Sequence, residues 1–119
     1  MSKEPYNFTF IELFICACIS KFPKLVEEIE IDILQDESCF NYAKMVSKMP
    51  DKDNELTYPL VVAKLDGQYA EFGFTEMNVE HIMQSKATSI DSLDYKQTRD
   101  QLRSSVGILK QRTNQLRLV

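Results

Sequence analysis

Apolar residues along the chain recur in runs whose spacing predicts several helices and a small sheet. Residues 8–21 are apolar on nearly every side of a helix, which is typical of a helix at the centre of a core. Pro23 ends this helix, because proline cannot continue the helical hydrogen-bond ladder. A second, shorter helix is predicted at "ESCFNYAKMVSKM", with Asp36 or Ser38 as its N-cap and Met49-Pro50 at its end.

The clearest local signal for a sheet is "YPLVVAKLDGQYAEFGF", residues 58–74. Asp66-Gly67 is a favoured pair for a two-residue hairpin turn, and pairing outward from it places Val61 and Ala63 on the same apolar face as Phe72. We therefore predict a β-hairpin that packs on the core. Because an isolated hairpin is marginal in water, a third strand or covering helices must complete it.

The stretch "LVEEIEIDIL" at residues 25–34 supports two interpretations. Acidic residues alternate with isoleucines over 28–33, which is the period of a strand. Pro23 followed by Glu27 and Glu28 also fits the start of a helix. We favour a third strand at 28–34, because the hairpin needs one.

Two more helices are predicted beyond the hairpin. The first covers "TEMNVEHIMQSK", with Thr75 as its cap, and ends at the following "ATS". The last begins near Thr88 or Ser89 and runs towards the C-terminus. The expected fold class is thus α+β: an antiparallel hairpin of two or three strands, packed by helices and followed by a long amphipathic C-terminal helix.

The C-terminal segment carries a heptad pattern. With Leu102 at position d, an apolar seam forms from d and a residues, and one flank of it, position e, is cationic at every heptad. The opposite flank holds Thr98, Ser105 and Arg112, so a self-paired coiled coil would give the cations no counter-charge. The residues expected to contact a partner are Tyr95, Lys96, Arg99, Leu102, Arg103, Val106, Leu109, Lys110, Leu116 and Arg117.

Charge divides the chain in the same place. Residues 1–94 carry a net charge of −9 and residues 95–119 a net charge of +5, within an overall −4. We therefore distinguish a globular body at 1–94 from a basic helix at 95–119. The helix needs a surface that offers both an apolar groove and negative charge. Three fit: the protein's own acidic body, an acidic surface on another protein, or a polyanion, which is either nucleic acid or an anionic lipid surface.

Little in the sequence indicates catalysis or a cofactor. The three cysteines are an odd number without disulfide-like spacing, which favours free thiols in a reducing, cytoplasmic setting. Cys16 and Cys18 are two residues apart and point to different sides of a helix, so no metal site is expected. His81 lacks the flanking residues of a nucleophile pair, and no glycine-rich phosphate loop is present. The apolar run near the N-terminus is too short to span a membrane.

These patterns predict a non-catalytic protein-interaction module, such as an adaptor, inhibitor or assembly subunit, which docks a partner through its C-terminal helix. The alternative is a regulator associated with nucleic acid, which would place the same cations on phosphates. The sequence pI of about 5.0 makes this alternative the weaker of the two.

Overall fold

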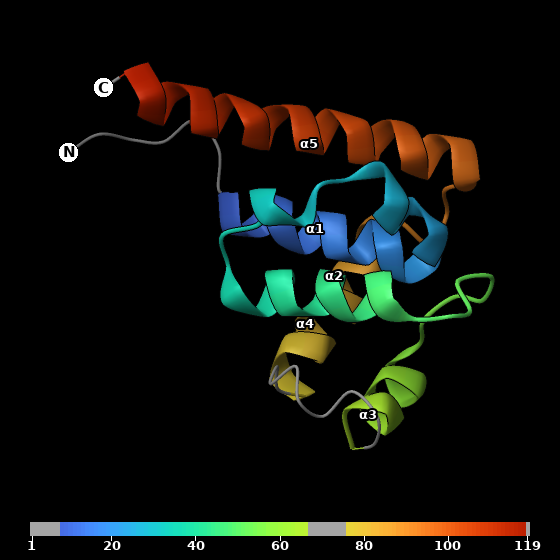
Figure 1. Ribbon diagram of the computed structural model, residues 1–119. Coiled ribbons are helices and arrows are strands. Elements are labelled where there is room, and N and C mark those ends of the chain that lie inside the picture. The colour runs from blue at the N-terminus through green and yellow to red at the C-terminus, as the bar shows by residue number, and fades with distance from the viewer. Residues whose placement is uncertain (1–7, 67–75, 119) are drawn as a thin grey trace.

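The computed structural model describes the backbone of residues 8–66 and 76–118 and the side chains of residues 8–64 and 78–112. Within these ranges the chain is helical throughout and contains no strand, so the predicted α+β fold class is wrong. The elements shown in Figure 1 are α1 (Phe8–Lys21), the 3₁₀ helices η1 (Pro23–Glu28) and η2 (Ile31–Ile33), α2 (Glu37–Lys48), α3 (Tyr58–Asp66), α4 (Glu76–Ser89) and α5 (Tyr95–Leu118).

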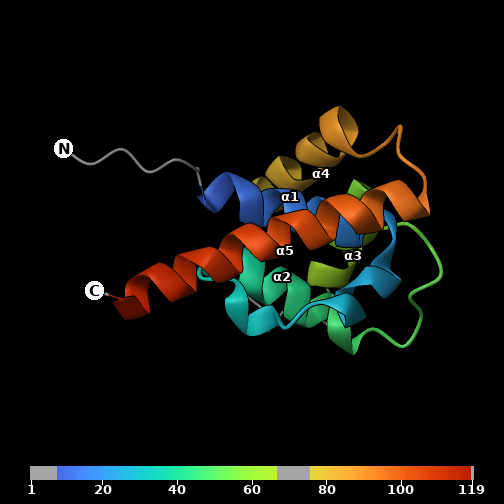
Figure 2. The same cartoon turned by 90° about the horizontal axis from the view of Figure 1, so that it is seen from above.

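Helix α1 is the centre of the molecule. It contacts α2, α4, α5 and η1, and residues 15–19 are completely buried. Figure 2 shows α5 running over α1, with α4 on one side and the η1–η2 segment and α2 on the other. The sequence pattern predicted both the bounds of this helix and its burial, because a helix covered on several sides has no polar face.

The predicted hairpin is wrong. Its first strand is α3, and its turn at Gly67 and second strand lie outside the described residues. Pro59 is the second residue of α3, where proline is tolerated because the first turn of a helix needs no backbone N–H donor. Val61 is fully buried, and α3 packs against α4. The β-branched run therefore reaches the core through a helix and needs no partner strand.

The predicted strand at 28–34 is also wrong. Residues 25–34 form the end of η1 and all of η2, joined by extended backbone at Ile29 and Glu30. Pro23 opens η1, which agrees with the helix-start alternative. The alternation has a real cause, because Ile29, Ile31 and Ile33 are half-buried against the core while the acidic residues between them are exposed.

The ends of the other helices show which local signals were sufficient. Asp36 caps α2 as predicted, because its carboxylate accepts a hydrogen bond from the Cys39 backbone N–H at 3.1 Å. In contrast, α4 continues through "ATS" to Ser89, so the predicted break is wrong. The Lys21 ammonium donates to the backbone carbonyls of Ile90 and Asp91, just beyond the end of α4. This contact places a positive charge at the C-terminal end of α4, where it interacts favourably with the helix dipole.

Helix α5 starts at Tyr95, later than the predicted start near Ser89. The Asp94 side chain accepts from the Gln97 N–H at 2.8 Å, and the Gln97 side chain accepts from the Asp94 N–H at 2.9 Å. This reciprocal pair is a capping box, here with Asp and Gln.

Candidate interaction site on α5

The buried stripe of α5 follows the 4-3 spacing of a helix packed lengthwise on another. Its members are buried to 9% exposure or less and contain two leucines, two small hydroxyl residues and one arginine: Thr98, Leu102, Ser105, Leu109 and Arg112. Relative to the predicted seam, the stripe keeps the d leucines and adds the g flank. The body of the protein therefore covers d and g, and position e stays outside.

Small residues in this stripe let α5 lie close to α1. The Thr98 hydroxyl donates to the Asp94 carbonyl at 2.8 Å, and the Ser105 hydroxyl donates to the Gln101 carbonyl at 3.0 Å. Both hydroxyls are thus satisfied within their own helix, which is how Ser and Thr are accommodated inside helices. They can be buried without a polar partner on α1.

Arg112 joins α5 to two other elements, α1 and η2, through three contacts. Its Nη1 donates to Oε2 of Glu12 on α1 at 3.0 Å, and its Nη2 donates to the Ile33 carbonyl at 2.8 Å. The guanidinium also lies over the Phe8 ring, 5.0 Å from its centroid. Since both charged side chains are at least 90% buried, this pair is part of the core.

Glu12 completes the network from its other oxygen. Its Oε1 accepts backbone N–H groups from Gln35 and Asp36, both at 2.9 Å, just before α2. A buried carboxylate with a paired guanidinium and two N–H donors has the partners that a buried charge requires. The acidic residue Glu12 inside the apolar run of α1 is therefore part of a buried ion pair that connects elements of the fold.

The cationic flank of α5 points away from α1. Lys96, Arg103 and Lys110 are all exposed. Arg103 donates through Nε and Nη2 to Oε1 of Glu28, at 3.0 and 2.9 Å. Among the described side chains, Lys96 and Lys110 form no ion pair. Of the three cations on the flank whose side chains the structure describes, Arg103 is thus paired with the protein's own body.

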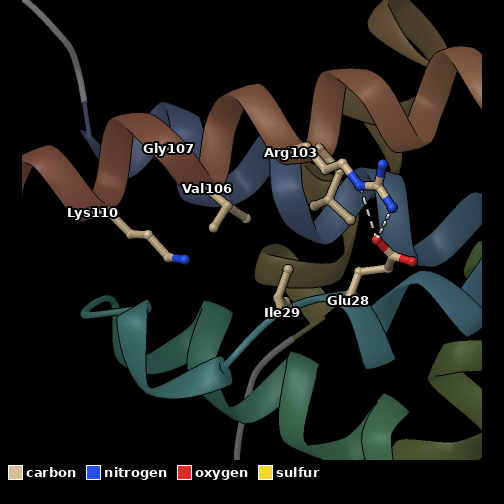
Figure 3. Close-up of a pocket in the computed structure, with 7 residues that line it drawn as sticks. Glu28, Ile29, Arg103, Val106, Gly107 and Lys110 are labelled. Atoms are coloured by element: carbon tan, nitrogen blue, oxygen red, sulfur yellow. Dashed lines mark hydrogen bonds and ion pairs between the residues drawn. The ribbon is translucent and has the colours of Figure 1, made fainter.

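A pocket of about 250 Å³ opens between α5 and the end of η1, at Glu28 and Ile29 (Figure 3). In Figure 3, Arg103 reaches across to Glu28 at one end of the pocket, and Lys110 extends at the other end. The apolar lining comes from both walls. The complete lining consists of Glu28, Ile29, Leu102, Arg103, Val106, Gly107 and Lys110.

Gly107 contributes open space to this pocket. A Cβ built on it would meet nothing within 4 Å. Gly107 thus has no crowding that would require glycine, although glycine in a helix interior is less stable than alanine. Packing within the fold therefore does not explain why a glycine lines the pocket at this position.

Those of the predicted partner-binding residues whose side chains the structure describes divide into three groups. Leu102 and Leu109 are completely buried in the core, and Leu102 also borders the pocket from there. Tyr95 is 42% exposed and packs edge-on against Phe22, with ring centroids 5.3 Å apart, and half-buried Arg99 lies over the Tyr95 ring. The exposed cations and half-buried Val106 face outwards or line the pocket. The side chains of Leu116 and Arg117 lie outside the described residues.

Several residues that matter here were missed by sequence reasoning. Thr98, Ser105 and Arg112 were assigned to an outer flank, although their spacing matched that of the leucines. Glu28 and Ile29 lie far from α5 in the sequence, so only the fold brings them to the pocket. One sequence signal could have indicated the Glu12–Arg112 pair. Glu12 is an acidic residue inside the apolar run of α1, and Arg112 is a basic residue at the spacing of the leucines in α5.

The three cysteine thiols are buried in the core. Cys16, Cys18 and Cys39 are free and fully buried. Burial raises the pKa of the Cys18 thiol to about 12 and also raises the pKa of Cys16 well above its ordinary value. Thiols with raised pKa are poor nucleophiles at neutral pH. Within residues 8–64 and 78–112, no group of three His, Cys, Asp or Glu side chains is placed to hold a metal ion.

No protein family, curated protein or solved structure matches this chain. In the described part of the chain, no helix is both long enough and apolar enough to cross a membrane.

Proposed function

We propose that this protein is a non-catalytic interaction module that binds a partner protein on the outward flank of α5. The observation that carries the proposal is the pocket beside Gly107, where apolar side chains of two segments lie next to the exposed ammonium of Lys110. A concave apolar surface with a few placed polar groups is the usual form of a binding site. The partner contacts are Val106, the exposed cations and the opposite wall, since Leu102 and Leu109 are part of the core.

The partner is an acidic protein surface. Lys96, Arg103 and Lys110 follow one another at seven-residue intervals, roughly 10 Å apart along a helix that rises 1.5 Å per residue. They stand on a body whose other charges are mostly negative, so they form a local cationic strip. Charge complementarity of this kind selects partners and fixes their orientation more than it adds affinity.

Capture from extracts of cells that express the protein tests this proposal. The bait is the full chain, compared with Lys96→Glu/Lys110→Glu on the flank and with Lys44→Glu/Lys48→Glu on α2, which changes the net charge equally. Partners should be lost from the first variant and retained by the second. The same partner list from all three baits would count against the proposal.

The alternative function, binding of nucleic acid, would use the same cations. The same capture experiment can distinguish it from binding of a partner protein. Repeating the capture after nuclease treatment would remove partners bridged by nucleic acid and leave direct protein partners in place. Phosphate contacts also weaken by roughly one power of salt concentration for each contact. Arg103 is already paired with Glu28, so two of the three described cations are free of an ion pair to offer phosphates.

A further inference from the structure

We propose that the pocket beside Gly107 takes one bulky apolar side chain of a partner segment, together with a carboxylate one or two residues away from it, which Lys110 holds. The inference rests on the proposed function and specifies the chemistry that the flank recognises. It follows from the charge, the volume and the opening of the pocket.

Charge around the pocket is balanced at one end and open at the other. At one end Glu28 accepts two hydrogen bonds from Arg103, so these two side chains satisfy each other. At the other end Lys110 is exposed and has no ion-pair partner among the described side chains. A ligand therefore meets a free cation at the Lys110 end only, and this sets the direction in which it lies.

The acidic residues of the η1 wall disfavour a second carboxylate on that side of the ligand. Glu28 lines the pocket, and Glu27 and Glu30 are exposed beside it on the same segment. A second carboxylate placed towards this wall would face like charges, which disfavours binding. The ligand thus carries its acid on the side of α5 and none on the side of η1.

The middle of the pocket is apolar and small. Ile29 comes from one wall and half-buried Val106 comes from α5, where the fully buried Leu102 borders the pocket from the core. The volume of about 250 Å³ is just below the ~300–1,000 Å³ typical of sites for drug-sized ligands. One large aliphatic or aromatic side chain suits this space better than a cofactor does.

Gly107 lets the partner backbone approach. Glycine often marks a place where another backbone comes close, because it has no Cβ. The fold does not need glycine here, since an added Cβ meets nothing within 4 Å. A side chain at this position would instead occupy space that an incoming segment needs.

A titration of the full-length protein with short synthetic peptides, followed by backbone amide shifts in NMR spectra, tests the inference. The probe is an acetylated, amidated peptide in which one Phe and one Asp, two residues apart, are set in a Gly-Ser background. Three further peptides replace Asp by Asn, Asp by Lys, or Phe by Ala. The Phe–Asp peptide should produce saturable shifts at Ile29, Val106 and Gly107.

Selectivity among the peptides gives the decisive comparison. Replacing Asp by Asn should weaken binding by about two- to fivefold, the range expected for one exposed ion pair. Replacing Phe by Ala should abolish the shifts. With Lys110→Glu, the preference should reverse in favour of the Lys peptide, while Lys96→Glu, off the pocket on the same flank, should leave the order unchanged. Equal binding of the Asp and Lys peptides to the wild-type chain would overturn the inference.

Gly107→Leu provides a variant that blocks the pocket without removing any contact of the fold. It should lose the peptide-induced shifts while its spectrum remains folded, and unchanged affinity would overturn the inference. If the peptides leave Ile29, Val106 and Gly107 unshifted but flank reversal still removes partners from the extract, the pocket assignment fails and the proposed function survives. If the peptides bind in the pocket but flank reversal leaves the partner list unchanged, the pocket assignment stands and the proposed function fails.

Discussion

Arg112 of α5 and Glu12 of α1 form a buried ion pair across a sequence separation of 100 residues, with Nη1 and Oε2 3.0 Å apart. The same guanidinium holds the Ile33 carbonyl, and the same carboxylate holds the N–H groups that precede α2. One pair of side chains thus fixes the relative positions of α1, η2, α2 and α5. Helix α5 is held to the body by charge as well as by its leucines.

Arg112→Ala should destabilise the protein strongly. It leaves Glu12, which is 2% exposed, without a counter-charge, and removing one partner of a buried pair costs about 3–5 kcal/mol. The free energy of unfolding, measured by urea denaturation at neutral pH, should fall by an amount in this range.

The matched control is Arg103→Ala. Arg103 lies on the same helix as Arg112 and pairs with Glu28 of η1. Its side chain is 57% exposed, and such pairs contribute ~0–1 kcal/mol. If both alanine variants lost the same small amount, the Glu12–Arg112 pair would not be buried as described.

Gly107→Ala should stabilise the protein by about 1 kcal/mol, the difference between glycine and alanine in a helix interior. The added methyl group meets no neighbour within 4 Å, so no strain opposes the gain. Thermal and urea denaturation would measure it. A loss of stability would show that position 107 is more crowded than the structure indicates.

Stability should fall at alkaline pH. Burial raises the pKa of Cys18 to about 12, from 9.0, and raises the pKa values of Cys16 and Tyr42 above their ordinary values. Because the folded state keeps these protons longer than the unfolded chain, their stabilising contribution is complete below about pH 9 and is lost progressively above it. Each group contributes a slope of about 1.4 kcal/mol per pH unit.

Tyr42→Phe isolates one of these groups. The Tyr42 hydroxyl is 2.5 Å from the Ser20 hydroxyl, so the variant should lose some stability at neutral pH. Above about pH 10 its free energy of unfolding should decline less steeply than that of the wild-type chain, because one titrating group is gone. Parallel curves for the two proteins would contradict this assignment.

A chain that ends at residue 94 should fail to fold cooperatively. It would lack Leu102 and Leu109, which are core residues, and would leave Glu12 buried without Arg112. Circular dichroism during heating and the dispersion of NMR amide signals would measure the effect. A well-dispersed spectrum from this fragment would show that α5 is an accessory to the core.

Some of the fold could be predicted because the signals were local. The bounds of α1 followed from a long apolar run ended by Pro23, and the start of α2 followed from the Asp36 cap. Asp94 and Gln97 carried a signal of the same kind, but the preceding Thr88-Ser89 also resembled a helix start. Capping residues identify possible starts, and packing decides which of them is used.

The sheet was predicted wrongly because β-branched residues report burial more than strand geometry. Val61 is buried in a helix. Ile31 and Ile33 turn towards the core from the 3₁₀ helix η2, and Ile29 does so from the extended backbone before it. A short apolar run cannot by itself distinguish a strand from a buried helix. Pro59, taken as a strand residue, fits the first turn of α3 equally well.

The candidate site was predictable on one side only. The positions of Lys96, Arg103 and Lys110 on one outward flank followed from their seven-residue spacing. The body covers one edge of the leucine row, and the choice of edge depends on the small size of Thr98 and Ser105 and on the position of Glu12. Helical periodicity alone does not reveal these tertiary contacts. Glu28 and Ile29 enter the pocket through the path of the chain after α1, a tertiary effect.

The central place of α1 has a consequence for biosynthesis. Its apolar surface emerges from the ribosome before α4 and α5, which pack against it, and the partner of Glu12 is residue 112. In a nascent chain, the apolar surface of α1 therefore stays exposed and Glu12 stays unpaired until translation has passed that residue. Exposed apolar surface in this state favours aggregation. Ribosome-arrested chains stalled before residue 112 should be cleaved readily by protease, whereas longer ones released from the exit tunnel should resist it.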